Sequence, residues 1–328
     1  MSEFSVKVVQ INDFSRVLNS DSLSIISIFG CPCIFRSTDF KRGDKAIYIP
    51  IDSVIPEGIP QLKFLPYKNG FHRVKAVRLR GVFSMGLLVK SPEEFEIGQD
   101  VTNILGIKKY EEPENVKTSG LQESVPFYCP KYNVESYRKY KDLLIEDEEV
   151  WIAEKVHGCN FRAIYTNNRM YIGSHGTWKK ESNENVYWMA AKQKGLFNKL
   201  VNYPDMVFYG EVFGPVQDLK YGKTKDNLGL MFFDIFDIPN GKFLDYNELE
   251  SIIANLSLEL VPTLFKGPLK KQLLEPLSEG KSTLANHIRE GLVVRPTRER
   301  INLETSQRII FKLVSESYLL RKNGTEYQ

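Results

Sequence analysis

A lysine stands between an apolar segment and a glycine turn in residues 154–161, which read EKVHGCNF. A strand before Lys155 and another after Gly158 would hold the lysine amine on rigid backbone at the floor of a cleft. A lysine that acts as a nucleophile must first lose its proton, which requires burial, neighbouring cations or a bound metal ion. The short pattern is common, so an ordinary lysine at the end of a strand is the alternative.

Four further residues follow in an order that suits activation of a nucleotide. Glu211 lies between two glycines at the end of an apolar run, where backbone and carboxylate can approach a ligand closely. Phe233 lies in an aromatic run and can stack on a planar base. Glu290 and Lys312 bring a second acid and a second lysine to later strands. Taken singly, each has a simpler alternative: surface acids, a core aromatic and a solvated lysine.

The elements that position these side chains mix strands and helices without a strict βαβ order. Strands are expected at 150–154, 161–165, 170–173, 207–210, 230–236, 291–295 and 309–314. Helices are expected at 186–200, 246–255, 281–288 and 315–322. This arrangement is typical of an α+β domain in which helices flank antiparallel sheets.

The first 110 residues read instead as short strands separated by turn signals. Strands are expected at 24–29, 33–38, 45–51, 74–80 and 85–89. Val77 and Leu79 alternate with Arg78 and Arg80, which predicts a half-buried strand with a basic outer surface. Short strands in this number and length predict a small β-barrel, of which the OB type commonly binds nucleic acids.

Basic side chains gather in this part of the chain. No acidic residue lies between Glu57 and Glu93, and the basic residues there are interleaved with aromatic residues. Cations beside exposed rings suit the phosphates and bases of a nucleic acid. A solvated charged face over an aromatic core is the alternative. The candidate nucleic-acid contacts are Lys63, Lys68, Arg73, Lys75, Arg78 and Arg80.

The composition of the 328 residues argues against several classes of protein. The net charge is only +3 at pH 7, from 44 basic and 41 acidic residues, so charge alone does not indicate a nucleic-acid partner. Neither a membrane span of ~18 apolar residues nor a secretory signal is recognisable, so we expect no membrane association. The 4 cysteines fit neither a disulfide framework nor zinc spacing, which predicts reduced thiols in a cytoplasm.

A change in composition divides the chain. Residues 111–146 are polar and contain several prolines and clustered glutamates, which predicts a linker. We therefore expect an OB-like nucleic-acid-binding domain at 1–110, a linker at 111–146 and an α+β domain at 147–328.

The order of these residues resembles the covalent nucleotidyltransferase superfamily of polynucleotide ligases and RNA-capping enzymes, whose nucleophile lies in a K-x-(D/H)-G motif. His157 in that motif, with Cys-Asn-Phe after the glycine, is most similar to ATP-dependent RNA ligases. Residues 48–56 (YIPIDSVIP) and 73–87 (RVKAVRLRGVFSMGL) resemble the OB module that precedes the transferase domain in one group of these ligases. The resemblance spans nearly the whole chain and implies an ATP-grasp-like ligase domain after the OB module.

The resemblance implies a three-step reaction. Lys155 would attack the α-phosphorus of ATP to give lysyl-AMP, AMP would pass to an RNA 5′-phosphate, and a 3′-hydroxyl would then displace it. Mg²⁺ or Mn²⁺ would neutralise the α-phosphate oxygens. Glu211 would hold the ribose or a metal-bound water, Glu290 a metal-bound water, and Lys312 the α-phosphate.

The resemblance also implies the remaining nucleotide contacts. Phe233 would stack on adenine, and Glu154 would lie near the adenine edge. His157 would lie near the phosphate or a metal-bound water, and Asn160 near the sugar or phosphate. Gly158 belongs to the same binding loop.

Two positions depart from the pattern of related ligases. His175 stands where many of them have an arginine, so charge at this position would depend on pH. Ile310 stands where many have the first of two lysines. Phosphate neutralisation is then left to Lys312 alone or to one of three other basic residues, Arg295, Arg308 and Lys179.

The resemblance implies an AMP-forming polyribonucleotide ligase that acts as a monomer on RNA. Its substrate would be a nicked duplex or free ends, with an RNA/DNA hybrid as a further option. A capping guanylyltransferase or DNA ligase is a weaker alternative, because these enzymes generally place the OB module last and favour aspartate where His157 stands. An RNA-binding protein with a degenerate transferase domain is the alternative from another class.

Overall fold

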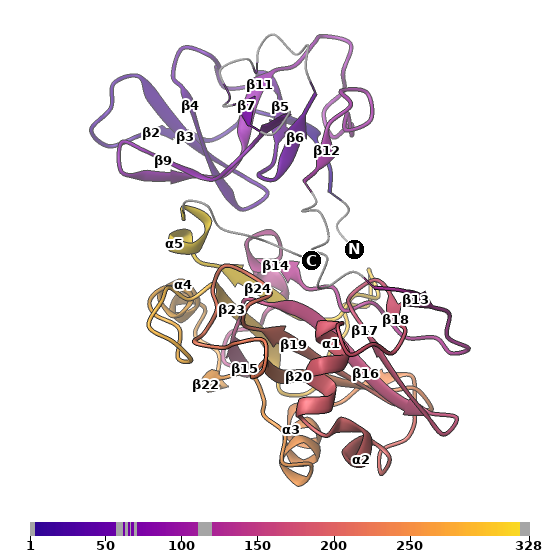
Figure 1. The fold of residues 1–328 in the computed structure, drawn as a ribbon. Coiled ribbons are helices and arrows are strands. Elements are labelled where there is room, and N and C mark those ends of the chain that lie inside the picture. The colour runs from indigo at the N-terminus through magenta and orange to yellow at the C-terminus, as the bar shows by residue number, and fades with distance from the viewer. Residues whose placement is uncertain are drawn as a thin grey trace. The chain divides into compact units, whose positions relative to one another are not determined.

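The computed structural model describes residues 4–56, 62, 65, 71–110 and 120–321, together with the backbone of residues 67–68. The chain divides into two units, Met1–Glu111 and Glu112–Gln328, and both are drawn in Figure 1. Among the described residues, no helix combines the length and apolar character needed to cross a membrane.

The first unit is a set of short antiparallel sheets with buried apolar side chains between them. Its strands pair in the orders β1-β5-β11, β2-β3-β4, β12-β6-β8-β7 and β10-β9. Alternate side chains such as Val8, Ile47 and Ile49 point inward and are buried together. The strands are β1 (Lys7–Gln10), β2 (Phe14–Arg16), β3 (Leu23–Ile28), β4 (Cys31–Arg36), β5 (Lys45–Ile49), β6 (Ser53–Ile55), β7 (Tyr67–Lys68), β8 (Phe71–Arg73), β9 (Val77–Leu79), β10 (Val82–Ser84), β11 (Leu87–Lys90) and β12 (Lys108–Lys109).

The hairpin of β9 and β10 differs from the expected half-buried strand. Val77 and Leu79 are 41% and 39% exposed, so neither face of β9 is buried. The turn at Arg80 and Gly81 has positive φ at both residues, 51° and 83°, as a tight two-residue hairpin requires. The prediction of one buried face is therefore wrong, because β9 pairs only with β10 among the described residues.

The second unit contains two sheets that provide its framework. The seven-stranded sheet has the order β13-β18-β17-β16-β19-β20-β21, and the five-stranded sheet has the order β14-β24-β23-β15-β22. All pairs are antiparallel except β14 with β24. The strands are β13 (Gln122–Glu123), β14 (Glu135–Ser136), β15 (Glu149–Glu154), β16 (Cys159–Thr166), β17 (Arg169–Gly173), β18 (Trp178–Lys179), β19 (Met206–Phe213), β20 (Gly229–Asp237), β21 (Lys242–Phe243), β22 (Thr263–Pro268), β23 (Gly291–Pro296) and β24 (Phe311–Val314).

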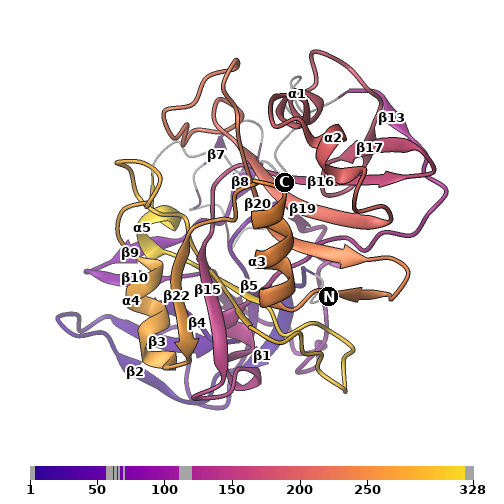
Figure 2. The same ribbon diagram turned by 90° about the horizontal axis from the view of Figure 1, so that it is seen from below.

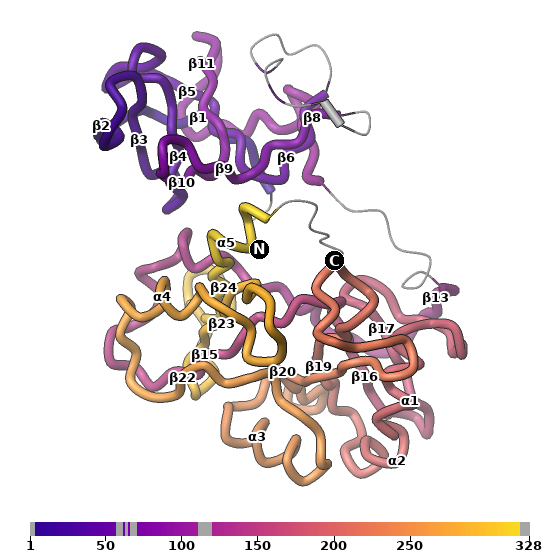
Figure 3. The backbone as a smooth tube through the Cα atoms, turned by 60° about the vertical axis from the view of Figure 1, so that its left-hand side comes forward, coloured from indigo at the N-terminus to yellow at the C-terminus, as the bar shows by residue number. Residues whose placement is uncertain are grey.

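Helices cover the outer side of each sheet. The helices are α1 (Val186–Gln193), α2 (Leu196–Leu200), α3 (Tyr246–Asn255), α4 (Leu274–Ser278) and α5 (Glu316–Leu319), with 3-10 turns η2 (Tyr137–Lys139), η3 (Lys141–Leu143) and η4 (Lys271–Leu273). Helices α1, α2 and α3 share an apolar core with the seven-stranded sheet. Figure 2 shows these helices from below. Helix α4 packs on β23 and β24, which run side by side in Figure 3. The expected α+β architecture is confirmed.

Two sequence expectations for this unit are wrong. Of the predicted linker at 111–146, residues 111–119 lie outside the described residues. Residues 120–146 are not a linker, because β13 pairs with β18, β14 pairs with β24, and the Tyr137 ring is buried in the core. Residues 281–288 form no helix; Lys281 and Ile288 instead pair as an isolated bridge. The helix of this region is α4, which begins earlier in the chain.

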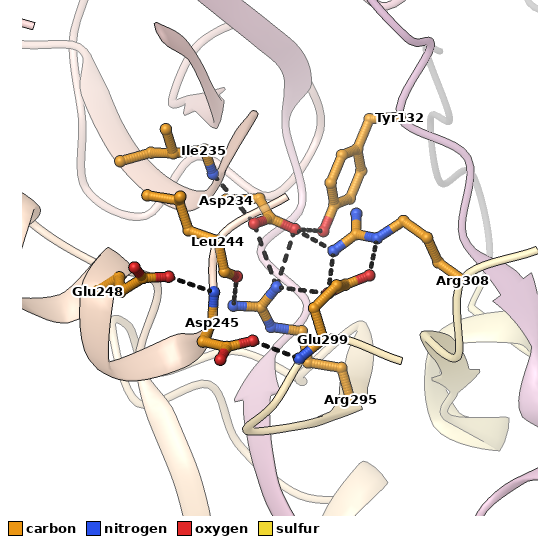
Figure 4. Close-up of polar contacts among 9 residues, drawn as sticks. All are labelled: Tyr132, Asp234, Ile235, Leu244, Asp245, Glu248, Arg295, Glu299 and Arg308. Carbon is orange, nitrogen blue, oxygen red and sulfur yellow. Dashed lines mark hydrogen bonds and ion pairs between the residues drawn. The ribbon is translucent and has the colours of Figure 1, made fainter. Parts of the chain in front are cut away.

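A buried ion-pair cluster joins the two sheets (Figure 4). Asp234 on β20 accepts hydrogen bonds from Arg295 of β23 at 3.1 Å, from Arg308 at 2.7 Å and from the Tyr132 hydroxyl at 2.8 Å. Glu299 pairs with Arg308 at 2.5 Å, which balances the second guanidinium. The Asp234 and Arg295 side chains are 0% and 3% exposed. Each buried charge therefore depends on the others for compensation.

We expect Asp234→Ala to destabilise the second unit by about 3–5 kcal/mol, because it leaves the Arg295 guanidinium buried without its carboxylate. Urea unfolding followed by tryptophan fluorescence measures this unit selectively, since Trp151, Trp178 and Trp188 all belong to it. The matched control is Glu181→Ala, which breaks an exposed pair with Lys192 and should cost under about 1 kcal/mol. Equal losses in the two variants would contradict the assigned role of Asp234.

Candidate active site

Lys155 lies where β15, an inner strand of the five-stranded sheet, ends. Strand β15 pairs with β22 on one side and β23 on the other, and its apolar side chains are buried on both faces. The Lys155 backbone N–H donates to the carbonyl of Gly291 at 3.0 Å, so the lysine stays tied to the start of β23. Its side chain is 26% exposed, and its amine is therefore held by the sheet without being sealed from solvent.

The register of two strands shifts just before residues of the site. Strand β15 shifts against β22 between Ile152 and Ala153, shortly before Lys155. Strand β19 shifts against β20 between Tyr209 and Gly210, directly before Glu211. Such irregularities turn the following side chains away from the regular alternation of a strand, which is one way to aim them at a site.

The Lys155 amine forms an ion pair with Glu290, with 2.6 Å between Nζ and Oε1. Glu290 directly precedes β23 and its side chain is 8% exposed. Burial raises the pKa of Glu290, but the Lys155 ammonium and His157 lower it more, to about 2. Glu290 is therefore a carboxylate at neutral pH, and it favours the protonated form of the lysine.

Glu211 lies on β19 opposite Asn160 of β16. Burial raises the pKa of Glu211 to about 8; Lys155 opposes this shift and Glu290 adds to it. The two acids of the site thus have pKa values displaced in opposite directions. Gly158 allows the close approach of the lysine loop to β19, because a Cβ there would lie 2.2 Å from the Val212 carbonyl oxygen.

His157 is almost fully enclosed, with 3% of its side chain exposed. Its Nε2 lies 2.7 Å from Asp218, and its Nδ1 lies 2.9 Å from the Tyr318 hydroxyl and 3.3 Å from Glu290. Burial lowers the pKa of His157, but hydrogen bonds to Asp218 and Glu290 outweigh it, so the pKa lies above 6.5. Both ring nitrogens are engaged by protein, which does not favour the expected contact with phosphate or a metal-bound water.

Glu154 precedes the lysine and its side chain is 0% exposed. Its Oε2 accepts hydrogen bonds from the backbone N–H and the hydroxyl of Thr283, at 2.8 and 2.7 Å. Among the described residues, its Oε1 is buried without a hydrogen-bond partner. The carboxylate is thus fixed in orientation and keeps one oxygen available for a donor on a ligand.

Phe233 and Lys312 come from the two different sheets. Phe233 on β20 is partly buried, and its ring lies 4.7 Å from the ring of Tyr132. Lys312 on β24 lies opposite Val293 of β23 and is also partly buried. Ile310, which directly precedes β24, is buried among aromatic residues, so a lysine there would lose its hydration.

The other basic candidates for phosphate contact have different surroundings. Arg295 and Arg308 are engaged by Asp234 in the buried cluster, which leaves Lys312 and Lys179 of that set. Lys179 is buried on β18. His175 lies in the turn between β17 and β18, at the end of the sheet where β16 begins.

The basic candidates of the first unit differ in exposure and in their contacts. Lys75, Arg78 and Arg80 are exposed on and beside the β9–β10 hairpin. Arg73 is 14% exposed, pairs with Asp52 at 2.6 Å and stacks on Tyr110, so its guanidinium is already engaged within the first unit and its contact with nucleic acid stays a prediction. Lys63 lies outside the described residues, and only the backbone of Lys68 is described.

The sequence did not single out several residues that shape the site. Asp218 and Tyr318 hold His157, Thr283 holds Glu154, and the Tyr221 hydroxyl accepts the His157 backbone N–H at 2.8 Å. They lie in loops and a short helix far from Lys155 in sequence. No local pattern marks them, because only the folded sheets bring them together.

The donor set fits a divalent cation that is bound jointly with a ligand. Within the described part of the chain, no group of three or more His, Cys, Asp or Glu side chains could hold a metal ion. Glu211 and Asn160 lie side by side, however, and the Asn160 Oδ1 is buried without a hydrogen-bond partner among the described residues. One or two carboxylates, completed by phosphate oxygens and water, suffice for Mg²⁺.

Two family models match this chain. Residues 148–314 match the model described as RNA ligase, which covers about half of the chain. Residues 5–91 match an OB-fold domain, which confirms the expected OB-like module.

Solved structures and one curated protein are also similar. An RNA ligase of Naegleria gruberi with PPi has a TM-score of 0.83 and 23% identity, covering 97% of this chain and 98% of that chain. A mutant of that ligase with ATP and Mn has a TM-score of 0.82 and 23% identity, covering 96% and 98%. These matches confirm the fold. Protein Early 65 kDa of Autographa californica nuclear polyhedrosis virus is 25% identical over 129 residues, which are 36% of this chain but only 23% of that protein.

We expect Glu211→Gln to stabilise the second unit increasingly as pH rises from 5 to 9. A folded-state pKa of about 8, above the usual 4.5, means that the folded protein holds a proton that the unfolded chain has lost, so stability falls as pH rises through this window. Glutamine cannot ionise and escapes this loss. The gain should reach roughly 1–3 kcal/mol near pH 9.

Urea unfolding by tryptophan fluorescence in EDTA measures this difference. Glu259→Gln is the matched control, because Glu259 is 58% exposed and its variant should follow the wild type at every pH. A constant difference between Glu211→Gln and wild type across the pH range would contradict the assigned pKa of Glu211.

Proposed function

This chain belongs to the RNA ligase family, and we propose that it joins RNA 3′-hydroxyl and 5′-phosphate ends with ATP through a lysyl-AMP intermediate on Lys155. The observation that carries the proposal is the distance of 2.6 Å between the Lys155 amine and Glu290. The two acids of the site also have displaced pKa values, about 2 for Glu290 and about 8 for Glu211. The relatives with bound ATP, AMP and PPi support the choice of nucleotide.

The first step forms one bond and breaks another at phosphorus. The neutral Lys155 amine attacks the α-phosphorus of ATP, the bond to the bridging oxygen breaks, and pyrophosphate leaves with its electron pair. The Lys155 ammonium must lose its proton before the attack, and because the pKa of Glu290 is about 2, that carboxylate positions the amine and does not keep the proton. The proton passes to solvent, which reaches the 26% exposed lysine side chain. The end of β15 holds the Lys155 amine in position, and such positioning accounts for much of the rate enhancement in phosphoryl transfer.

The later steps use the same adenylate. An oxygen of the RNA 5′-phosphate attacks the phosphorus of lysyl-AMP and releases the Lys155 amine. The 3′-hydroxyl then attacks the activated 5′-phosphate, a phosphodiester forms, and AMP leaves. The joined RNA, AMP and pyrophosphate account for every atom of ATP.

Each remaining side chain of the site would contact one part of the nucleotide. Phe233 would stack on adenine, and the unpartnered Oε1 of Glu154 would accept a hydrogen bond from the adenine amine. Asn160 would contact the sugar or phosphate, and Lys312 would contact the α-phosphate. His175 would lie near Asn160, at the end of the seven-stranded sheet where β16 begins.

Mg²⁺ or Mn²⁺ would be held by Glu211 and Glu290, directly or through water. A divalent cation bound there would neutralise charge on the α-phosphate during the transfer. The titration of Glu211 links this binding to pH, since its proton must leave before the carboxylate can act as a ligand.

The first unit would hold the nucleic acid. The exposed basic side chains of Lys75, Arg78 and Arg80 suit a phosphate backbone and carry no base specificity.

We expect the wild type to acquire an acid-labile, alkali-stable label from ATP labelled at the α-phosphate, and Lys155→Ala to acquire none. Denaturing electrophoresis with autoradiography detects the covalent adduct. Lys194→Ala is the matched control, because Lys194 forms a surface pair with Glu259 and its removal should leave labelling intact. GTP should give no label. An unlabelled wild type or a labelled Lys155→Ala would overturn the proposal.

We expect sealing of a nicked duplex to be faster when the 3′-hydroxyl side ends in ribose than when it ends in deoxyribose. The 2′-hydroxyl beside the nucleophile is the group that distinguishes RNA from DNA at this end. Single-turnover sealing of four nicks, with ribose or deoxyribose on each side independently, measures both preferences. Joining an all-DNA nick as fast as an all-RNA nick would contradict an RNA substrate while leaving lysyl-AMP formation intact.

A further inference from the structure

The short helix α5 contacts the loop that carries the candidate nucleophile. Helix α5 follows β24 directly and lies beyond residues 148–314, which match the RNA ligase model. The Ser315 hydroxyl caps it by accepting the Tyr318 backbone N–H at 3.1 Å. The helix is therefore fixed in orientation by its own first turn.

Tyr318 reaches from this helix to His157. Its hydroxyl lies 2.9 Å from the Nδ1 of His157, and the two rings meet edge to face with centroids 5.3 Å apart. Tyr318 is 1% exposed. A buried hydroxyl in this place fixes both the tilt of the imidazole and the position of the loop, because a displaced ring would leave polar groups unsatisfied.

Asp218 and Arg321 close a ring of contacts around the same imidazole. Asp218 accepts from Nε2 of His157 through one oxygen and from Arg321 through the other, at 2.7 and 3.2 Å. The Arg321 guanidinium lies 3.4 Å from the centre of the Tyr318 ring and donates to the Tyr318 carbonyl. The helix is thus joined to both nitrogens of His157.

The residue that caps the same helix is bonded to the backbone just before β23. The Ser315 backbone N–H donates to the carbonyl of Glu290 at 2.9 Å, and its hydroxyl donates to the carbonyl of Arg289 at 2.9 Å. One turn of chain therefore contacts the backbone of Glu290 and the side chain of His157. Glu290 in turn pairs with Lys155 through Oε1 and lies 3.3 Å from His157 through Oε2.

We propose that α5 is a positioning element for formation of lysyl-AMP, in which Tyr318 acts through His157 to hold the Lys155 loop in register with Glu290. This inference rests on the proposed function. It adds Tyr318, Asp218 and Arg321 as positioning residues that act through His157. Because an error of about 1 Å in such a site costs up to about 100-fold in rate, a single hydroxyl at this distance has a measurable effect.

The test is single-turnover labelling of the full chain with α-labelled ATP over a range of concentrations. We expect Tyr318→Phe to lower the maximal rate of lysyl-AMP formation by about 10-fold or more, with half-saturation by ATP changed less than about twofold. Tyr246→Phe is the matched control, because it also removes one tyrosine hydroxyl bond, to Glu250 on α3, at a buried ring of the same unit. It should label at the wild-type rate.

Thermal unfolding of each variant separates positioning from folding. We expect Tyr318→Phe and Tyr246→Phe to have the same midpoint of thermal unfolding. Should Tyr318→Phe fail to fold, Asp218→Asn decides, because its carboxylate is 25% exposed and the substitution preserves its shape. Asp218→Asn is also expected to slow labelling, and the double variant to be slowed by less than the product of the two effects, since both act through one ring.

A folded Tyr318→Phe that labels at the wild-type rate would overturn the inference, as would a loss confined to half-saturation by ATP. Where Tyr318→Phe does not fold, a folded Asp218→Asn with the wild-type rate would do so. Strictly multiplicative effects of Tyr318→Phe and Asp218→Asn would show independent action and also overturn it. A wild type that acquires no label would instead refute the proposed function, so the two failures are distinguishable.

Discussion

The ion pair of Lys155 and Glu290 is the interaction on which the candidate site depends. It joins the end of β15 to the start of β23, and the backbone bond from Lys155 to Gly291 sets the two strands in register beside it. Glu290 keeps the amine in place, yet a carboxylate at 2.6 Å also favours the ammonium form, which cannot attack. The contact with Glu290 thus holds the Lys155 amine in position and keeps it protonated until the charges around it change.

The two sheets must be held at a fixed distance for this pair to face Glu211. The buried cluster of Asp234, Arg295 and Arg308 spans them, with polar groups from β20, β23 and the chain before β24. A buried charge cluster is a costly connector compared with apolar packing. It has a strict geometry, however, because any shift of one sheet would leave a guanidinium without its carboxylate. That strictness suits a site whose acids come from both sheets.

The sequence predicted the strands that carry the site, because long apolar runs ending in a charged or glycine residue are strong local signals. Strands β15, β19, β20 and β23 begin and end within a few residues of the expected bounds. The failures arose where tertiary contacts decide. Residues 120–146 look like a linker by composition but add strands to sheets formed much later in the chain. The run 281–288 has a helical pattern, yet the Thr283 backbone is held by Glu154.

Side-chain surroundings were the least predictable part of the site. Arg73 and Arg78 read alike in the sequence, and only the fold shows that Arg73 is held by Asp52 beneath Tyr110 while Arg78 is exposed. The partners of His157 were likewise invisible, since Asp218 and Tyr318 lie 61 and 161 residues away from it. Spacing in sequence identifies chemistry that is carried by one strand and its turn, but it cannot identify contacts made by distant loops.

The charges of the site explain why a nucleotide and a cation would have to arrive together. The Lys155 amine faces the ionised Glu290, and Glu211 stays protonated below a pH of about 8. A triphosphate alone would bring negative charge to a place where Glu290 is already ionised, and buried like charges repel strongly. Additional positive charge between the phosphates and the acids would reverse this repulsion and draw Glu290 away from the amine. The removal of Glu290 as a partner would in turn lower the pKa of the lysine, so binding of the charged ligand itself would make the nucleophile available.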